Sequence, residues 1–144
     1  MARIKLSLPH TFTFSTNIKV RITDINYGGH VGNDSFLSLI HEARLQFLTH
    51  YGYNEMNFAG VGLIMSDVVI EFNTEAFYGD ELRIDIVAND FSRVSFDLVY
   101  KFSKKSIKGS QVIVAVAKTG MICYDYGKKK VVGIPDEANI KLTQ

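Results

Sequence analysis

The most regular hydrophobic pattern in the chain begins at Asn33. From there, apolar residues recur at the spacings of one helical face, at Phe36, Ile40, Ala43, Phe47 and Tyr51. The first three residues, Asn-Asp-Ser, are favoured N-cap types, and Gly52 suits the left-handed position that follows a helix. The pattern predicts one helix of about 17 residues, roughly 26 Å long, which is enough to cross a small domain.

Most of the remaining chain alternates apolar and polar residues with the period of two that is typical of β-strands. The predicted strands cover residues 11–22, 63–74, 82–89, 94–102 and 112–126. The last strand is apolar on both faces over residues 113–117, which predicts a central strand covered on both sides. Residues 53–60 are ambiguous and could form one helical turn, whereas Pro135 marks the start of a short helix.

The order of one strand, one long helix and four strands predicts an α+β fold. The helix is the only long element that can cover the apolar face of the strands. We therefore expect an antiparallel, curved sheet of five or six strands wrapped around one long central helix. We expect the 144 residues to form one domain, spanning residues 1–144. Surplus apolar character on the outer face of the last strand predicts contact with another subunit.

Composition narrows the class of protein. The formal net charge is +1 and 47% of the residues are hydrophobic, a balance that favours neither nucleic acid nor a membrane surface as partner. The first 15 residues contain no apolar signal-peptide core, and no apolar run approaches the length of a membrane span. The single cysteine, Cys123, has no partner in the chain and lies in an apolar run, where it is expected to be inert. These features predict a soluble, cytoplasmic protein.

Two segments resemble the hotdog-fold thioesterases. They are TDINYGGHVGNDSFLSLIHEAR at residues 23–44 and FYGDELRI at residues 77–84. The resemblance covers residues 12–124 and is strongest to the hydroxybenzoyl-CoA thioesterase-like proteins and to the thioesterases of acyl carrier protein (ACP). It implies a hotdog fold and hydrolysis of acyl-CoA or acyl-ACP without a metal or other cofactor. It also implies a homodimer or homotetramer with active sites at the subunit interface.

The glycine-rich turn before the helix is the candidate binding site for the thioester carbonyl. Gly28, Gly29, Val31 and Gly32 lie there. The start of a helix offers free backbone N–H groups and a partial positive charge, and glycine allows a substrate to approach the backbone closely. Alternatively, the glycines only form a tight turn.

The candidate catalytic groups are Asp24, Asn26, His30 and Glu42. The hydroxybenzoyl-CoA thioesterase-like proteins carry an aspartate where this chain has Asn26, whose amide cannot take a proton from water. Asp24, two residues earlier on the same side of an extended backbone, could supply the charge or could cap the turn. His30 could orient water or assist proton transfer, or it could be an ordinary surface histidine. Some hotdog thioesterases use a helix glutamate, which makes Glu42 a candidate, although a solvated flank is the alternative.

Further residues could contact other parts of the substrate. Candidate acyl-tunnel side chains are Phe36, Met65, Phe72 and Phe77, each of which could instead be core. Candidate ligands of the coenzyme A phosphates are Arg93, Lys104, Lys105 and Lys108, which could instead be soluble hairpin tips. Ser95 belongs to the strand of serine and aromatic residues that fits the same family.

Two other functions remain open from the sequence. A hotdog-type hydratase or dehydratase would place an acid and a histidine near the helix start, as Asp24 and His30 allow, but the N-P-H turn expected for it is missing. A non-catalytic protein that binds acyl thioesters is compatible with Asn26.

Overall fold

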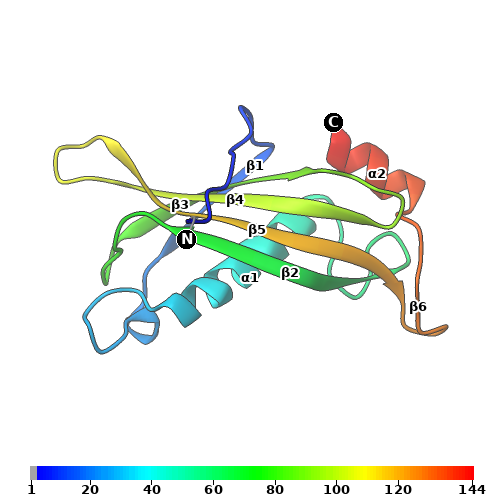
Figure 1. Ribbon diagram of the computed structural model, residues 1–144, viewed down its shortest axis with the longest axis horizontal. Coiled ribbons are helices and arrows are strands. Elements are labelled where there is room, and N and C mark those ends of the chain that lie inside the picture. The colour runs from blue at the N-terminus through cyan, green and yellow to red at the C-terminus, as the bar shows by residue number, and fades with distance from the viewer. Residues whose placement is uncertain (1–2) are drawn as a thin grey trace.

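The computed structural model describes residues 3–144 and contains one six-stranded antiparallel sheet with two α-helices (Figure 1). The strands are β1 (Phe14–Lys19), β2 (Gly62–Phe72), β3 (Glu81–Asn89), β4 (Ser95–Lys105), β5 (Gln111–Asp125) and β6 (Lys130–Val131). The helices are α1 (Asn33–His50) and α2 (Asp136–Thr143), with a short 3-10 helix, η1 (Ile22–Asp24), ahead of α1. The predicted α+β class, antiparallel sheet, long helix from Asn33 and short helix after Pro135 are thereby confirmed.

The strands lie in the order β1-β3-β4-β5-β2, and β6 pairs with β5. Strands β3, β4 and β5 follow one another as hairpins, whereas β2 crosses to the far edge instead of pairing with β3. In the middle of β5, Ala117 lies opposite Tyr100 of β4 on one side and Ile70 of β2 on the other. The strand that is apolar on both faces is therefore central, as its sequence predicts.

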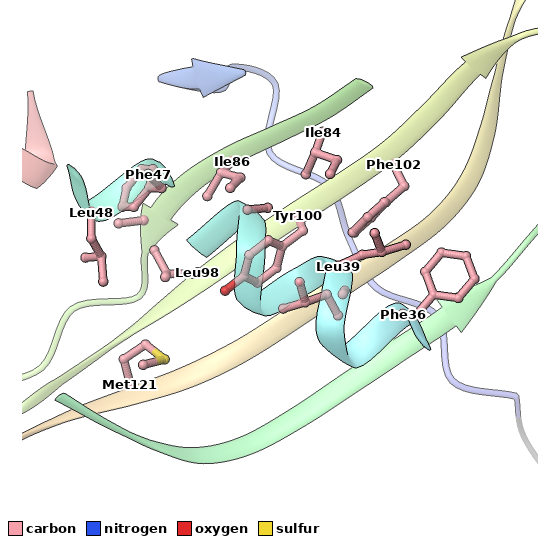
Figure 2. Close-up of a cluster of buried hydrophobic side chains, with 14 of the residues drawn as sticks. Phe36, Leu39, Phe47, Leu48, Ile84, Ile86, Leu98, Tyr100, Phe102 and Met121 are labelled. Atoms are coloured by element: carbon pink, nitrogen blue, oxygen red, sulfur yellow. The ribbon is translucent and has the colours of Figure 1, made fainter. Parts of the chain in front are cut away.

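Helix α1 packs across one face of this sheet (Figure 2). Its buried apolar residues are Phe36, Leu39, Ile40, Ala43, Phe47 and Leu48, and they meet Ile84, Ile86, Leu98, Tyr100 and Phe102 of β3 and β4. Leu37 and Leu45 remain 45% and 37% exposed, so in the single chain the sheet covers only one side of the helix. Within residues 3–144, neither helix combines the length and hydropathy that a membrane crossing requires.

A buried arginine fastens α1 to the loop that follows it. The Arg44 Nε donates a hydrogen bond to Glu55 Oε1 at 2.8 Å, and the Glu55 carbonyl accepts the Leu63 amide at 2.7 Å. The Arg44 side chain is 8% exposed and the Glu55 side chain 27%. This pair links the helix to the start of β2, which gives Arg44 a structural role.

The loop at residues 53–60 contains no helical turn, so the one helical turn considered for this ambiguous segment is not formed. Asn54 Oδ1 accepts the amides of Met56 and Asn57 at 2.9 and 2.8 Å, and Asn57 Oδ1 accepts the Gly60 amide at 2.9 Å. Asparagine side chains satisfy the backbone here in place of helical hydrogen bonds.

The first strand is shorter than predicted because a turn follows it directly. The chain leaves the sheet after Lys19, and the Asp24 carboxylate accepts the Arg21 amide at 2.8 Å, which closes η1. The alternation of residues 11–22 cannot show this turn, since it is decided by one side-chain acceptor.

Before β1, residues 3–12 lie over the face of the sheet opposite α1 (dark blue in Figure 1). The Leu6 amide donates to Glu71 Oε1 at 2.9 Å, and Lys101 Nζ lies 5.1 Å from the centroid of the Phe12 ring. Val116, in the same cross-strand row as Glu71 and Lys101, is 3% exposed. The chain itself therefore covers part of the outer apolar face, and the predicted subunit contact there stays a prediction.

Candidate functional site

A cavity of about 170 Å³ lies at the amino end of α1. It is formed where the turn before α1, the first turn of α1 and the segment after β2 meet. Its lining includes His30, Asn33, Phe36, Phe72, Thr74 and Glu75. The Phe36 and Phe72 rings meet edge to face with centroids 5.3 Å apart. The cavity therefore combines an aromatic part with several polar groups, which is the usual composition of a small-molecule site.

Asn26 organises the turn that leads into the cavity. Its Oδ1 accepts hydrogen bonds from the backbone N–H groups of Gly28 at 2.9 Å and His30 at 3.4 Å. The backbone N–H of Asn26 donates to the His30 carbonyl at 2.9 Å. Gly29 has φ +86°, a conformation that favours glycine. The side-chain oxygen of Asn26 thus holds the turn, and through it the position of His30.

The backbone amides of the glycine-rich turn are already hydrogen-bonded. Besides the two that bond Asn26 Oδ1, the Gly29 amide donates to the Asn26 carbonyl at 3.1 Å, the Val31 amide to the Ala76 carbonyl at 2.8 Å and the Gly32 amide to the Asp24 carbonyl at 3.1 Å. In the single chain, Gly28, Gly29, Val31 and Gly32 therefore do not offer free donors to a substrate. That their amides bind the thioester carbonyl stays a prediction, and in the single chain each of them already has an acceptor.

The first residues of α1, directly after this turn, have backbone amides without a hydrogen-bond acceptor in the described part of the chain. No acceptor among residues 3–144 bonds the amides of Asn33, Asp34 and Ser35, and the first helical bond is from Phe36 to the Gly32 carbonyl at 3.3 Å. Gly32 is the N-cap and supplies no side chain. Because Asn33 lines the cavity and is the first residue of α1, the positive end of the helix lies next to the cavity.

His30 lies in the wall of the same cavity. Its Nδ1 is 3.1 Å from the Val31 carbonyl oxygen, and its Nε2 is 3.2 Å from Glu75 Oε2. Both neighbours are acceptors, so both contacts are hydrogen bonds only when the ring carries a proton on each nitrogen. Sequence analysis did not find Glu75, because it belongs to the segment after β2 and carries no motif of its own.

Asp24 is not among the residues that line this cavity, and it is 3% exposed. Its carboxylate accepts the Arg21 amide at 2.8 Å and forms an ion pair with the Arg21 guanidinium at 3.3 Å. Of the two roles left open by the sequence, the geometry matches capping of the turn. Asp24 does not line the cavity, and a catalytic role for it stays a prediction.

Glu42 also lies apart from the cavity. It follows Asn33 by about two and a half helical turns, which places it on the opposite side of α1. Its Oε2 accepts a hydrogen bond from Gln46 at 2.8 Å, and Gln46 in turn bonds the Thr16 hydroxyl of β1. Within one chain Glu42 is an exposed helix flank, as the alternative interpretation stated.

The predicted substrate-contacting residues divide between the two ends of the sheet. Phe36 and Phe72 line the cavity, whereas Met65 and Phe77 are 45% and 47% exposed and do not. Arg93 and Ser95 lie at the start of β4, and this strand of 11 residues runs roughly 33 Å to the end that faces the cavity. Figure 1 shows this separation. Within one chain, Arg93 and the lysines at and after the end of β4 (Lys104, Lys105 and Lys108) therefore cannot share one phosphate site.

Lys104 forms part of the fold rather than a free cationic site. Its Nζ donates to Asp80 Oδ2 at 2.9 Å and to the Glu75 carbonyl at 2.7 Å. Burial would raise the pKa of Asp80, but hydrogen bonds from Lys104 and from the Phe77 amide hold it below its ordinary value. The pair therefore contributes stability at neutral pH, which is lost as the pH falls through the folded-state pKa.

Two larger hollows, of about 380 and 420 Å³, lie elsewhere. Both include Arg83, Ser103 and Gln111, on strands β3, β4 and β5. Neither is lined by any residue of α1 or of the turn before it. Although both are larger, neither is lined by a histidine or by the first residue of a helix, whereas the smaller cavity is lined by His30 and Asn33.

Cys123 takes no part in the site and is expected to be unreactive. It is fully buried in β5, and burial raises the pKa of its thiol to about 11. At about pH 8 we expect iodoacetamide to alkylate it about 100-fold or more slowly than a free cysteine, because the thiolate is the reacting species. Mass spectrometry of timed samples measures the rate, with protein unfolded in guanidinium chloride as control. Equal rates in folded and unfolded protein would contradict this.

Comparison with known proteins agrees with the sequence resemblance. The family model of the thioesterase-like superfamily matches residues 20–142. A 1,4-dihydroxy-2-naphthoyl-CoA hydrolase of Microcystis aeruginosa is 29% identical over 120 residues, which is 81% of this chain and 83% of the relative.

Solved structures show the same fold. A 1,4-dihydroxy-2-naphthoyl-CoA thioesterase from Synechocystis superposes with a TM-score of 0.79 at 22% identity, over 91% of this chain and 96% of the other. The 4-hydroxybenzoyl-CoA thioesterase from Pseudomonas sp. strain CBS-3 superposes with a TM-score of 0.78 at 17% identity, over 92% of this chain and 99% of the other. The predicted hotdog-fold thioesterase family is thereby confirmed.

Proposed function

The chain belongs to the thioesterase-like superfamily, and we propose that it hydrolyses the thioester bond of an acyl-coenzyme A. The observation that carries the proposal is the cavity at the start of α1, which is lined by His30 and by Asn33, the first residue of the helix. The relatives named above act on aryl-CoA thioesters, which supports coenzyme A, rather than ACP, as the carrier.

The amino end of α1 is suited to the carbonyl oxygen of the thioester. When water adds to the carbonyl carbon, the oxygen gains negative charge, and the Asn33 amide with the positive end of the helix stabilises it. Such donors are already oriented before the substrate arrives, so no reorganisation is needed as the charge develops. Collapse of the intermediate breaks the C–S bond and releases coenzyme A and a carboxylate.

The aromatic part of the cavity is suited to the acyl group. Phe36 and Phe72 line the cavity and pack edge to face, an arrangement suited to contact with a flat acyl group, and Phe102 packs against Phe36 from the core. A volume of about 170 Å³ is below the roughly 300 Å³ or more of most drug-sized ligand pockets. Short or single-ring acyl groups therefore fit better than long chains.

An acyl-CoA panel tests this function. We expect release of free thiol from benzoyl-CoA and 4-hydroxybenzoyl-CoA, with kcat/KM at least about tenfold above that for palmitoyl-CoA, because long chains exceed the cavity. A thiol-reactive chromophore measures the release, and buried Cys123 will not contribute to the signal. Acyl-ACP substrates with matched acyl groups are the comparison. Absence of thiol release from every thioester tested would contradict the proposal.

The acid that the sequence offered for a hydratase, Asp24, is bonded to Arg21 and lies outside the cavity. The acid beside His30 is instead Glu75, so an enoyl-CoA is added to the panel. Hydration of the enoyl-CoA without release of thiol would favour the hydratase over the thioesterase.

A further inference from the structure

Hydrolysis in the cavity at the start of α1 requires a group that takes a proton from water. Of the sequence candidates only His30 lies in the cavity wall, and each of its ring nitrogens already lies beside an acceptor oxygen, of Val31 or of Glu75. The other candidates do not supply the group. The Asn26 side chain is an amide whose oxygen already accepts hydrogen bonds from two backbone N–H groups. Asp24 is buried against Arg21, and Glu42 lies on the opposite side of α1. The remaining question is which carboxylate reaches the cavity.

Glu75 is the one carboxylate among the residues that line the cavity. Its Oε2 lies 3.2 Å from His30 Nε2, and no donor from residues 3–144 contacts its Oε1. The side chain is 63% exposed, so water reaches it freely. His30 thus orients the carboxylate through one oxygen and leaves the other available to a water molecule.

The backbone around Glu75 is held from two sides. The Glu75 carbonyl accepts a hydrogen bond from Lys104 Nζ of β4 at 2.7 Å. The next carbonyl, of Ala76, accepts the Val31 amide at 2.8 Å, which ties the segment to the turn that carries His30. Ala76 is itself 1% exposed. A catalytic group needs such support from its surroundings to keep its position.

We propose that Glu75 is the general base of this enzyme, an inference that rests on the proposed thioesterase function. The Glu75 carboxylate removes a proton from water as the water oxygen bonds to the thioester carbonyl carbon, whose oxygen becomes negative beside the Asn33 amide. The C–S bond then breaks and the protonated Glu75 returns its proton to the leaving thiolate. The products are a carboxylic acid, which ionises in solution, and coenzyme A with a free thiol.

The test compares Glu75→Gln, Glu75→Asp and the control Glu81→Gln, an exposed glutamate at the start of β3 that does not line the cavity. Each is assayed with the best thioester of the panel. We expect Glu75→Gln to lower kcat by about 100-fold or more with KM changed less than about threefold, since the amide cannot accept a proton. We expect Glu75→Asp to keep more activity than Glu75→Gln, and Glu81→Gln to match the parent protein.

Chemical rescue separates a proton acceptor from a structural residue. In Glu75→Ala, added acetate is expected to restore part of kcat, because the open position admits a small carboxylate; acetate is expected to have no such effect on Glu75→Gln. Wild-type activity together with an active Glu75→Gln variant would overturn the role of Glu75 and leave the thioesterase function standing. Inactive wild-type protein with every thioester would instead remove the function, and the base with it.

Discussion

Replacing Asn33 with proline is expected to lower kcat by about 100- to 1,000-fold, which is the effect of removing one oxyanion-hole donor. Proline deletes the backbone N–H at the first residue of α1, the donor that we place against the thioester oxygen. The change isolates that single hydrogen, because the N–H has no acceptor among residues 3–144 and its loss breaks no bond of the fold.

The substitution suits the local backbone. Proline is favoured at the first position of a helix, where its fixed φ already matches. The preceding residue, Gly32, has φ −74° and ψ 155°, which is the extended conformation that a residue before proline prefers. We therefore expect the thermal unfolding midpoint to stay close to that of the parent protein.

Asn33→Ala is the matched control for the proline variant. It removes the same side chain and keeps the backbone amide, so we expect a loss of kcat of less than about tenfold. Steady-state kinetics with the best acyl-CoA measures both. Equal activity of Asn33→Pro and Asn33→Ala would show that the amide does not stabilise the reacting carbonyl.

Replacing Phe47 with alanine is expected to lower the free energy of unfolding by about 3–5 kcal/mol. Phe47 is fully buried in α1, and its ring contacts Phe14 of β1 and Tyr51 with centroids 5.9 and 5.0 Å apart. The ring fills the space between the helix and the edge of the sheet, so its removal leaves a cavity that the rigid strands cannot close.

Urea denaturation followed by circular dichroism measures this loss. The control is Thr49→Ala, an exposed position two residues further along α1, for which a change within about 1 kcal/mol is expected. A loss below about 1.5 kcal/mol for Phe47→Ala would mean that α1 is held to the sheet mainly by other contacts.

The elements of this fold are predictable because each follows from a local periodicity. The apolar spacing from Phe36 to Tyr51 requires a helix, and the alternation along β3 and β4 requires strands with one buried face. The predictions of local structure were wrong where one polar side chain accepts backbone hydrogen bonds and so ends or replaces the expected element. Asp24 ends the first strand early, and Asn54 and Asn57 hold a loop where a helical turn was possible.

The candidate site was predictable only in part. The position of the turn before α1, the helix start and His30 follow from residues 23–44, which are contiguous. Which amides are free does not, because the acceptors of Val31 and Gly32 come from Ala76 and Asp24, and only folding brings these carbonyls into place. The free donors consequently lie at Asn33 and after it rather than in the glycines.

Periodicity and capping signals in this chain were sufficient to predict the fold class, the long helix, the central strand and the position of the candidate site at the start of the helix. Each of these depends on residues that are close in the sequence. Partnerships between distant segments were not accessible in this way. The crossing of β2 to β5, the meeting of His30 with Glu75, and the separation of Arg93 from the cavity depend on which strands lie side by side. Strand order is set by the packing of the whole core, so a local sequence pattern does not predict it.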